Sequence, residues 1–328
     1  MISLVRRVRN KTRLTACLEN GVVEHSTLGL GVIYTRTAIN SLNGEWRAAV
    51  QIGDEPALFT EIYQPLDPRL RYFVTGAIGF DSTSVRIFDE SGNNLSRVQL
   101  NLYEMELGAG REFGTWGEGR VGYRRATGHA EVSIGPPMPD FDLDRGEVFV
   151  RLADDKLDNL NFPRAGHYGR LEWNVARETL GARRDYDQVQ LNYLHAFSRG
   201  RNTILGGLYA ATTFDQDAPI EGLFSLGGLF RLSGLEQNQL FGQHAGQLTI
   251  GYLRSLQPSG LLQPYFGAML EAGNVWQRRS DISFDNTIIS GSVFFGMDTL
   301  IGPIYLAYGH SDTGESAIYI RLGPRLAF

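Results

Sequence analysis

A two-residue alternation of apolar and polar side chains runs through most of the chain and constrains its fold more than any other feature. Leu171, Trp173 and Val175 alternate with Arg170 and Glu172, and similar runs recur from about residue 13 to the C-terminus. In a β-strand such alternation places the apolar side chains on one face. We count about 16 such runs, so the chain is predicted to be all-β.

The connections between these runs favour a closed barrel. Short turns at 198–200 and 257–260 alternate along the chain with longer loops. An even number of antiparallel strands with short turns at one end and long loops at the other is the layout of an outer-membrane barrel. No run of about 18 apolar residues occurs, so no transmembrane helix is expected. We predict a 16-stranded antiparallel transmembrane β-barrel with one long loop folded inward.

The barrel is expected to occupy residues 12–328. Residues 1–11 contain basic residues without the apolar core of a signal peptide, so they are interpreted as a linker that ends a missing periplasmic module. Trp46, Trp116, Trp173 and Trp276 lie near predicted strand ends, where aromatic rings meet the headgroups of a membrane.

The C-terminal strand is interpreted as a barrel-assembly signal. Leu322, Leu326 and the terminal Phe328 share one strand face, and Arg321 and Arg325 share the other. An arginine facing lipid at the midplane costs about 2–4 kcal/mol, so the arginine face is assigned to the lumen. A chain ending on an aromatic residue after such a strand is typical of outer-membrane barrels, which are inserted by the barrel-assembly machinery.

One long strand changes parity. Its apolar residues fall at Val98, Leu100 and Leu102 and then at Tyr103 and Met105. A β-bulge inserts one residue and re-aims a strand face, so we predict a bulge between Leu102 and Tyr103.

Charge and composition exclude several functions. The net charge is −5 with scattered basic residues, which disfavours nucleic-acid binding. The single Cys17 cannot form an internal disulfide, and the six histidines are isolated, so no metal site and no cofactor are expected. Glu104 and Glu106 share a strand face and are interpreted as lumen charges. They would balance a set of arginines in a fixed network suited to a plugged pore: Arg120, Arg124, Arg151 and Arg170.

Catalysis has one weak candidate. The chain has no Gly-x-Ser-x-Gly nucleophile elbow. His310, Ser311 and Asp312 lie together at a predicted strand end and could serve a barrel hydrolase. Neighbouring strand residues face opposite sides, however, and Ser and Asp after a strand usually form a turn. We therefore expect no enzymatic activity in this chain.

The longest loop spans residues 214–244, and its tip is the segment Gly227–Gly234. Long loops in compact proteins are uncommon and usually functional. The tip resembles the inward loop of the BamA/two-partner-secretion superfamily, whose 16-stranded barrels carry a Gly-Gly…Val-Arg-Gly-aromatic signature. Four residues match this signature: Gly227, Gly228, Leu232 and Gly234.

The resemblance also implies a contact inside the barrel. Ser233 stands where the family has its loop arginine, and Arg231 lies two residues earlier. The family arginine meets an acidic residue in a Phe-x-Asp-x-Gly strand motif, and Leu270-Glu271-Ala272-Gly273 occupies that place. The resemblance therefore implies that Glu271, with Gly273 in the same motif, is the lumen partner of the loop and pairs with Arg231.

Three further segments look most like the barrels of patatin-like type V autotransporters: 59–66, 152–166 and 306–309. This likeness implies an outer-membrane translocator and anchor that exports or displays an N-terminal patatin-like phospholipase, with the loop plugging the lumen. The partners it implies are membrane lipid, the barrel-assembly machinery, the chain's own POTRA module and passenger, and, as a family-level hypothesis, a second copy. The alternative is a passive, porin-like pore without a passenger.

Overall fold

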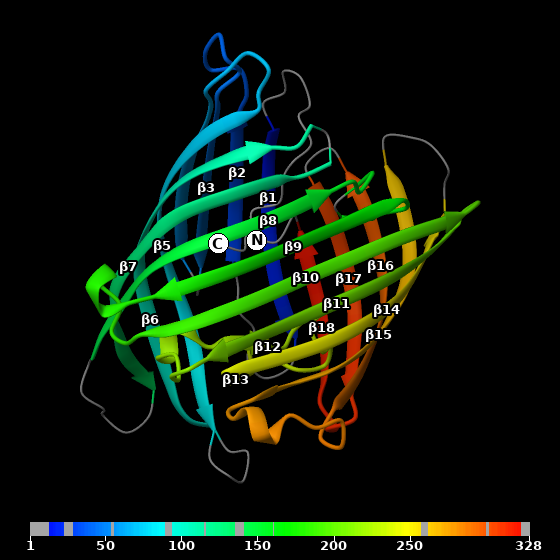
Figure 1. The fold of residues 1–328 in the computed structure, drawn as a ribbon. Coiled ribbons are helices and arrows are strands. Elements are labelled where there is room, and N and C mark those ends of the chain that lie inside the picture. Colours follow the sequence, from blue (N-terminus) through cyan, green and yellow to red (C-terminus); the bar gives the residue numbers. More distant parts are fainter. Residues whose placement is uncertain are drawn as a thin grey trace.

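The computed structural model describes residues 13–22, 29–53, 56–88, 94–114, 116–134, 141–159, 161–256, 262–299 and 302–322. Sixteen strands form one closed antiparallel barrel, in which β1 pairs with both β2 and β18 (Figure 1). The predicted fold class and strand number are confirmed. No helix in these ranges is long and apolar enough to cross a membrane. The barrel strands are β1 (Arg13–Val22), β2 (Gly29–Arg36), β3 (Glu45–Gly53), β4 (Ala57–Pro65), β5 (Tyr72–Phe88), β6 (Asn94–Glu112), β7 (Glu118–Ile134), β8 (Phe141–Asp155), β9 (Gly166–Ala176), β10 (Tyr186–Arg199), β11 (Asn202–Phe214), β14 (His244–Ser255), β15 (Gln263–Trp276), β16 (Ile288–Thr299), β17 (Gly302–Ser311) and β18 (Ser316–Leu322).

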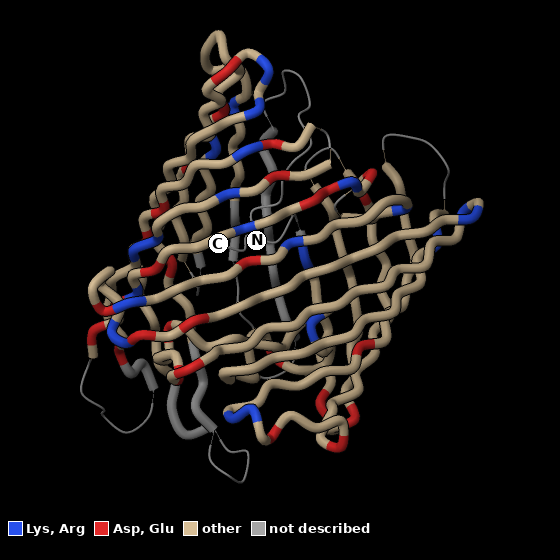
Figure 2. Tube along the Cα trace, in the orientation of Figure 1, with Lys and Arg blue, Asp and Glu red and all other residues tan. Residues whose placement is uncertain are grey.

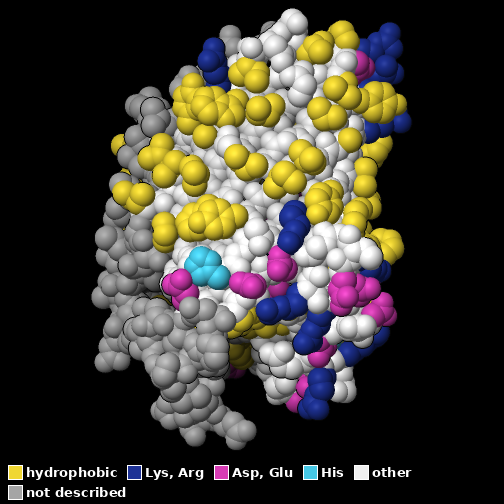
Figure 3. Space-filling model, turned by 90° about the vertical axis from the view of Figure 1, so that its left-hand side faces the viewer, with side chains coloured by type: hydrophobic (Ala, Val, Ile, Leu, Met, Phe, Trp, Pro, Cys, Tyr) yellow, Lys and Arg dark blue, Asp and Glu magenta, His cyan; other side chains and the backbone are white. Residues whose placement is uncertain are grey.

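The alternation divides the barrel into an apolar outer wall and a lumen that contains the buried charged side chains together with apolar clusters. Leu107, Trp173 and Ile250 point outward and are 50–63% exposed, while Glu147 and Glu172 are buried inside. Figure 3 shows the outer face as a broad apolar band with charged side chains beyond its edges, most of them below it in this view. A wall with apolar residues outside and polar residues inside is the arrangement expected in lipid.

The predicted bulge between Leu102 and Tyr103 is wrong. β6 pairs with β5 without a register shift from Arg97 to Arg111, and irregularities occur only near residues 87–88 and 97–98. Val98 and Leu100 face inward, where they pack with Leu143 and contact the long loop. The apolar side chains change faces because the loop fills this end of the lumen.

The connections at the two ends of the barrel differ less in length than the sequence analysis predicts. Segments 37–44 and 156–165 lie at one end, and 177–185 and 277–287 lie at the other. The segment between β11 and β14 is the clear exception. It contains a 3-10 turn η2 (Ile220–Gly222) and a two-stranded sheet of β12 (Phe224–Leu226) and β13 (Leu240–Gly242). Two further 3-10 turns, η1 (Glu178–Leu180) and η3 (Arg279–Asp281), lie in the connections at the same end.

The last strand is oriented as predicted. Tyr319 is buried in the lumen and Ile318 is exposed on the outer wall. Arg321, two residues after Tyr319, therefore lies on the lumen face of the strand. Leu322 ends β18, where its backbone pairs with Leu18 and Ile304. Its side chain, together with Leu326, Phe328 and the predicted linker 1–11, lies outside the described residues.

Candidate functional site

The base of the long loop is closed by hydrogen bonds between its two legs. The Gln243 side chain donates to the Ala218 carbonyl at 2.9 Å and accepts from the Ala218 amide at 3.0 Å. The Gln243 carbonyl accepts from the amide of Thr213 at 2.9 Å. Because the legs are joined where they leave the barrel wall, the loop returns through the lumen as one folded unit.

The tip of the loop requires left-handed backbone. Gly227, Gly228 and Gly234 have φ values of 128°, 100° and 108°, and Phe230 and Leu232 adopt 64° and 67°. Left-handed values are easy for glycine and rare for other residues. Gly227 donates to the Arg231 carbonyl at 2.8 Å, and Arg231 donates to the Gly228 carbonyl at 2.9 Å. The glycines therefore permit a compact turn that presents Ser233.

Ser233 binds Glu271 in a fully buried contact. The Ser233 amide donates to Glu271 Oε2 at 2.5 Å, and its hydroxyl donates to Oε1 at 3.0 Å. Both residues are 0% exposed. The same hydroxyl accepts from the Phe230 amide at 3.0 Å. Leaving a buried donor without its acceptor costs about 1–3 kcal/mol, so this contact ties the tip to β15.

The predicted pairing of Arg231 with Glu271 is wrong. Arg231 donates to the Ser225 carbonyl at 2.8 Å, and its guanidinium lies 4.7 Å from the centre of the Tyr209 ring. The tip turn directs Arg231 back along the loop, while the residue at the family's arginine position, Ser233, reaches the carboxylate. Glu271 contacts the loop as the resemblance implies, but through a different side chain.

Two small residues allow the tip to touch the wall. The Gly234 amide donates to the Tyr319 hydroxyl at 2.9 Å, and that hydroxyl donates to the Leu235 carbonyl at 2.9 Å. A Cβ at Gly234 would lie 2.7 Å from the amide nitrogen of Ser311, and one at Gly309 would lie 2.7 Å from that of Gly234. Gly273 allows close packing between β15 and β14, since a Cβ at this position would lie 2.4 Å from the Gly246 carbonyl oxygen.

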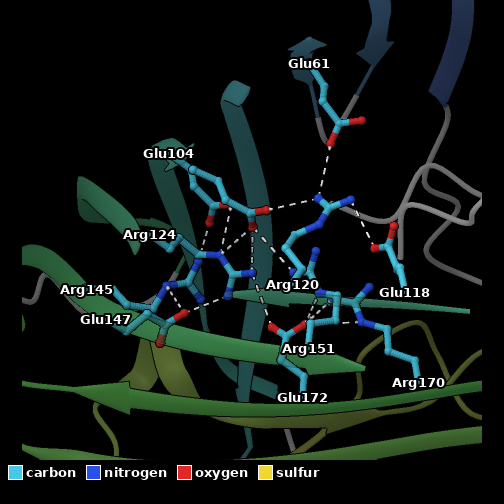
Figure 4. A network of polar contacts seen from close by, with 11 residues as sticks. Glu61, Glu104, Glu118, Arg120, Arg124, Arg145, Glu147, Arg151, Arg170 and Glu172 are labelled. Atoms are coloured by element: carbon cyan, nitrogen blue, oxygen red, sulfur yellow. Dashed lines mark hydrogen bonds and ion pairs between the residues drawn. The ribbon is translucent and has the colours of Figure 1, made fainter. Parts of the chain in front are cut away.

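The wall opposite the tip carries a network of alternating charges (Figure 4). Arg124 lies at its centre, 2.6 Å from Glu147, 2.8 Å from Glu106 and 3.2 Å from Glu172. Arg151 lies 2.6 Å from Glu172. The remaining members come from β4 and β6–β9: Glu61, Glu104, Glu118, Arg120, Arg145 and Arg170. Removing one member of a buried network would leave an uncompensated charge. The members of this network therefore hold one another in place.

A cavity of about 230 Å³ separates this network from the first leg of the loop. Glu61, Arg124 and Glu172 line one side, and Glu221 and Phe224 line the other. The tip of the loop is therefore held on β15, β17 and β18, while its legs pack on Val98, Leu100 and Leu143, and a polar space lies between the loop and the charged part of the β4–β9 wall.

An aromatic wedge enters the lumen from the opposite end. Phe162, in the 156–165 turn, stacks on Tyr265 and Tyr305 with ring centroids 4.5 and 4.8 Å apart. Leu229 of the loop tip belongs to the same buried cluster, and Phe230 packs against it. The lumen is thus filled from both ends, and the loop tip and the 156–165 turn meet inside it.

Comparison with solved structures gives the fold. BamA from Haemophilus ducreyi, in a form lacking POTRA domains 1–3, matches with a TM-score of 0.71 and 12% identity over 95% of this chain and 70% of that one. The chain shares the fold of BamA. CdiB from Escherichia coli and CdiB from Acinetobacter baumannii match with TM-scores of 0.68 and 0.65, each at 12% identity. This chain spans 63% and 60% of those two chains.

Sequence comparisons add no closer assignment. No family profile matches the chain, and no curated protein matches it in sequence. The BamA-like fold agrees with the superfamily resemblance of the loop tip.

The proposed hydrolase residues are dispersed. His310 is exposed and its Nδ1 lies 2.8 Å from the Ser316 hydroxyl, while Ser311 is buried and bonds Thr313. Asp312 accepts from the Ile289 amide at 3.1 Å. Within the described ranges, no cluster of three His, Cys, Asp or Glu residues could hold a metal ion.

Sequence reasoning found part of the site. Glu104, Glu106 and four of the arginines were assigned to a lumen network, and Glu271 was assigned to the loop. Glu61, Glu147 and Arg145 were missed, although each lies on the inward parity of its strand. The wedge formed by Phe162 was missed because an aromatic residue in a turn carries no signal of where it inserts.

Proposed function

We propose that this chain is the barrel of an outer-membrane translocator that exports or displays an N-terminal passenger, with residues 214–244 as an internal plug. The observation that carries the proposal is the buried contact of Ser233 with Glu271. It holds a long loop inside a BamA-like barrel through the position at which the superfamily resemblance implies a loop–wall contact.

The surroundings of the loop suit a removable plug. Toward β15, β17 and β18 its tip contacts the wall through Glu271, Gly309 and Tyr319. Toward β4–β9 it faces a polar cavity with mixed charges. A polypeptide passing along that wall would meet alternating charges rather than an apolar surface, so it would have little tendency to remain bound.

The finer assignment is to patatin-like type V autotransporters. It is supported by the sequence likeness of segments 59–66, 152–166 and 306–309. On this proposal a phospholipase passenger and a POTRA module precede the barrel, the barrel-assembly machinery inserts it, and the barrel itself catalyses no reaction. Self-association into a homodimer belongs to the same family-level proposal and is testable by cross-linking.

The runner-up is a passive pore. A porin-like channel needs an open lumen, whereas here Leu226, Leu232 and Leu235 of the loop are buried inside the barrel and Phe162 fills the other end. The filled lumen favours the translocator.

The test is export by a full-length protein that carries this barrel. Glu271→Ala removes the acceptor of Ser233, so we expect the amount of passenger exposed on intact cells, measured by added protease, to fall several-fold. Glu178→Ala, an exposed carboxylate in a connection at the same end as the loop, is the matched control. Unchanged passenger exposure in Glu271→Ala, with equal barrel levels, would contradict the proposal.

A further inference from the structure

The outer wall carries a row of hydrogen-bond donors at the end of the barrel opposite the long loop. Arg199 on β10 pairs with Asn202 on β11, and Asn202 pairs with Arg254 on β14. All three residues are exposed, while the adjacent Thr203 and Leu253 are 1% exposed in the lumen. Residues directly opposite in an antiparallel pair face the same side, so the three side chains emerge together on the outer wall.

The row presents donors without acceptors. The Tyr252 hydroxyl donates to Asn202 Oδ1 at 2.6 Å, which occupies the amide oxygen and leaves the amide NH₂ for another partner. A guanidinium group has donors only. Within the described residues, neither Arg199 nor Arg254 lies within ion-pair distance of a carboxylate, in contrast to the arginines of the lumen network. The row therefore carries two uncompensated positive charges and favours an anion.

The spacing suits a phosphate group. Adjacent strands lie about 4.8 Å apart, so the two arginine backbones flank Asn202 at about 10 Å from each other. Arginine side chains are long enough to converge across that distance, and their planar donors match phosphate oxygens in pairs.

The neighbouring surface is apolar. Phe197, Ile204 and Ile250 lie two or four residues from the row on the same face of its strands, and they are 53–65% exposed. At the adjoining β10–β11 turn, the Arg164 guanidinium donates to the Gly200 carbonyl, and Arg201 is exposed beside it. The tip of this hairpin is basic in Figure 2. Positive charge at the edge of an apolar outer wall is the arrangement that attracts anionic headgroups.

We propose that Arg199, Asn202 and Arg254 bind the phosphate of an anionic phospholipid in the leaflet at this end of the barrel. The inference rests on the proposed function only in taking the barrel to span a membrane. It assigns a defined lipid position beside the β10–β11 hairpin, with the acyl chains along Phe197, Ile204 and Ile250.

The test compares lipid retention by the folded barrel in neutral detergent micelles. Phosphatidylglycerol is titrated in, and bound lipid is counted by native mass spectrometry. We expect the Arg199→Gln, Arg254→Gln double variant to retain phosphatidylglycerol about tenfold more weakly than the parent, since two charge-assisted contacts are lost. Arg69→Gln, an exposed arginine in a turn at the same end, is expected to bind as the parent does.

Two further measurements distinguish lipid phosphate from free phosphate and control for misfolding of the variants. Inorganic phosphate at millimolar concentration should not displace the lipid, because the apolar wall contributes to binding. If the double variant fails to fold, Asn202→Ala and the single Arg254→Gln are used, each expected to weaken binding several-fold. Equal binding by parent and variants, equal binding of phosphatidylcholine, or full displacement by free phosphate would overturn the assignment. Any of these results in a barrel that still exports its passenger would leave the proposed function intact.

Discussion

At the scale of single residues, the buried side chain of Glu271 anchors the tip of the long loop. Replacing it with alanine leaves the Ser233 amide and hydroxyl without their acceptor, at a cost of about 1–3 kcal/mol. We expect Glu271→Ala to make the loop segment 224–242 sensitive to protease in the refolded barrel. Glu271→Gln keeps an oxygen acceptor and is expected to have a smaller effect. Protease resistance equal to the parent in Glu271→Ala would contradict this role.

Arg231 is expected to matter less than Glu271. Arg231→Ala loses a hydrogen bond to the Ser225 carbonyl and the contact with the Tyr209 ring, both of which lie away from Glu271. The tip would loosen internally while Ser233 stays bound. Comparing loop proteolysis in Arg231→Ala and Glu271→Ala therefore identifies the anchor. A larger effect for Arg231→Ala would restore the arginine to that role.

Two glycine-to-alanine variants distinguish the effect of backbone strain from the effect of close packing. Gly234→Ala adds a methyl group 2.7 Å from the Ser311 amide nitrogen at a φ of 108°. Gly314→Ala adds one at a φ of 91° with no atom within 4 Å. Left-handed backbone costs a non-glycine residue about 1–2 kcal/mol, so Gly314→Ala should lower the barrel's thermal stability slightly. Gly234→Ala should in addition release the loop to protease; equal behaviour of the two variants would show that close packing at Gly234 is unimportant.

At the scale of elements, the 156–165 turn is expected to close the lumen from the other end. Its Phe162 ring lies between Tyr265 and Tyr305, and the Asn159 side chain donates to Asp298 at 2.7 Å. Phe162→Ala should leave the strands paired and lower stability by about 3–5 kcal/mol. It should also increase ion leakage through the refolded barrel, measured by dye or ion release from vesicles. Leu66→Ala, in an exposed turn at the same end, is the control; equal leakage for both would show that Phe162 does not close the lumen.

The elements themselves were largely predictable because their signals are local. The alternation at Leu171, Trp173 and Val175 indicates a strand with one lipid face, and outward apolar residues recur around the barrel. The inward face is apolar as well at Val98, Leu100, Leu253 and Phe294, because segments distant in sequence pack there. The prediction for Arg231 was wrong because the direction of its side chain is set by the left-handed backbone at Phe230 and Leu232. Sequence patterns do not reveal such backbone.

At the scale of the whole molecule, the barrel is closed by two segments that meet in its lumen. The charged wall of β4–β9 is expected to remain in place when either segment moves, because the ion pairs of its network join residues of the barrel strands to one another. Opening therefore requires displacement of the loop and the turn rather than rearrangement of the barrel.

Single-channel conductance in planar bilayers distinguishes a plugged barrel from an open pore. The parent barrel is predicted to show small, flickering currents, and a variant with residues 224–242 replaced by a short Gly-Ser linker is predicted to show large, steady ones. Glu271→Ala should fall between them, with frequent long openings. A large, steady conductance in the parent would contradict the plugged translocator and favour an open pore.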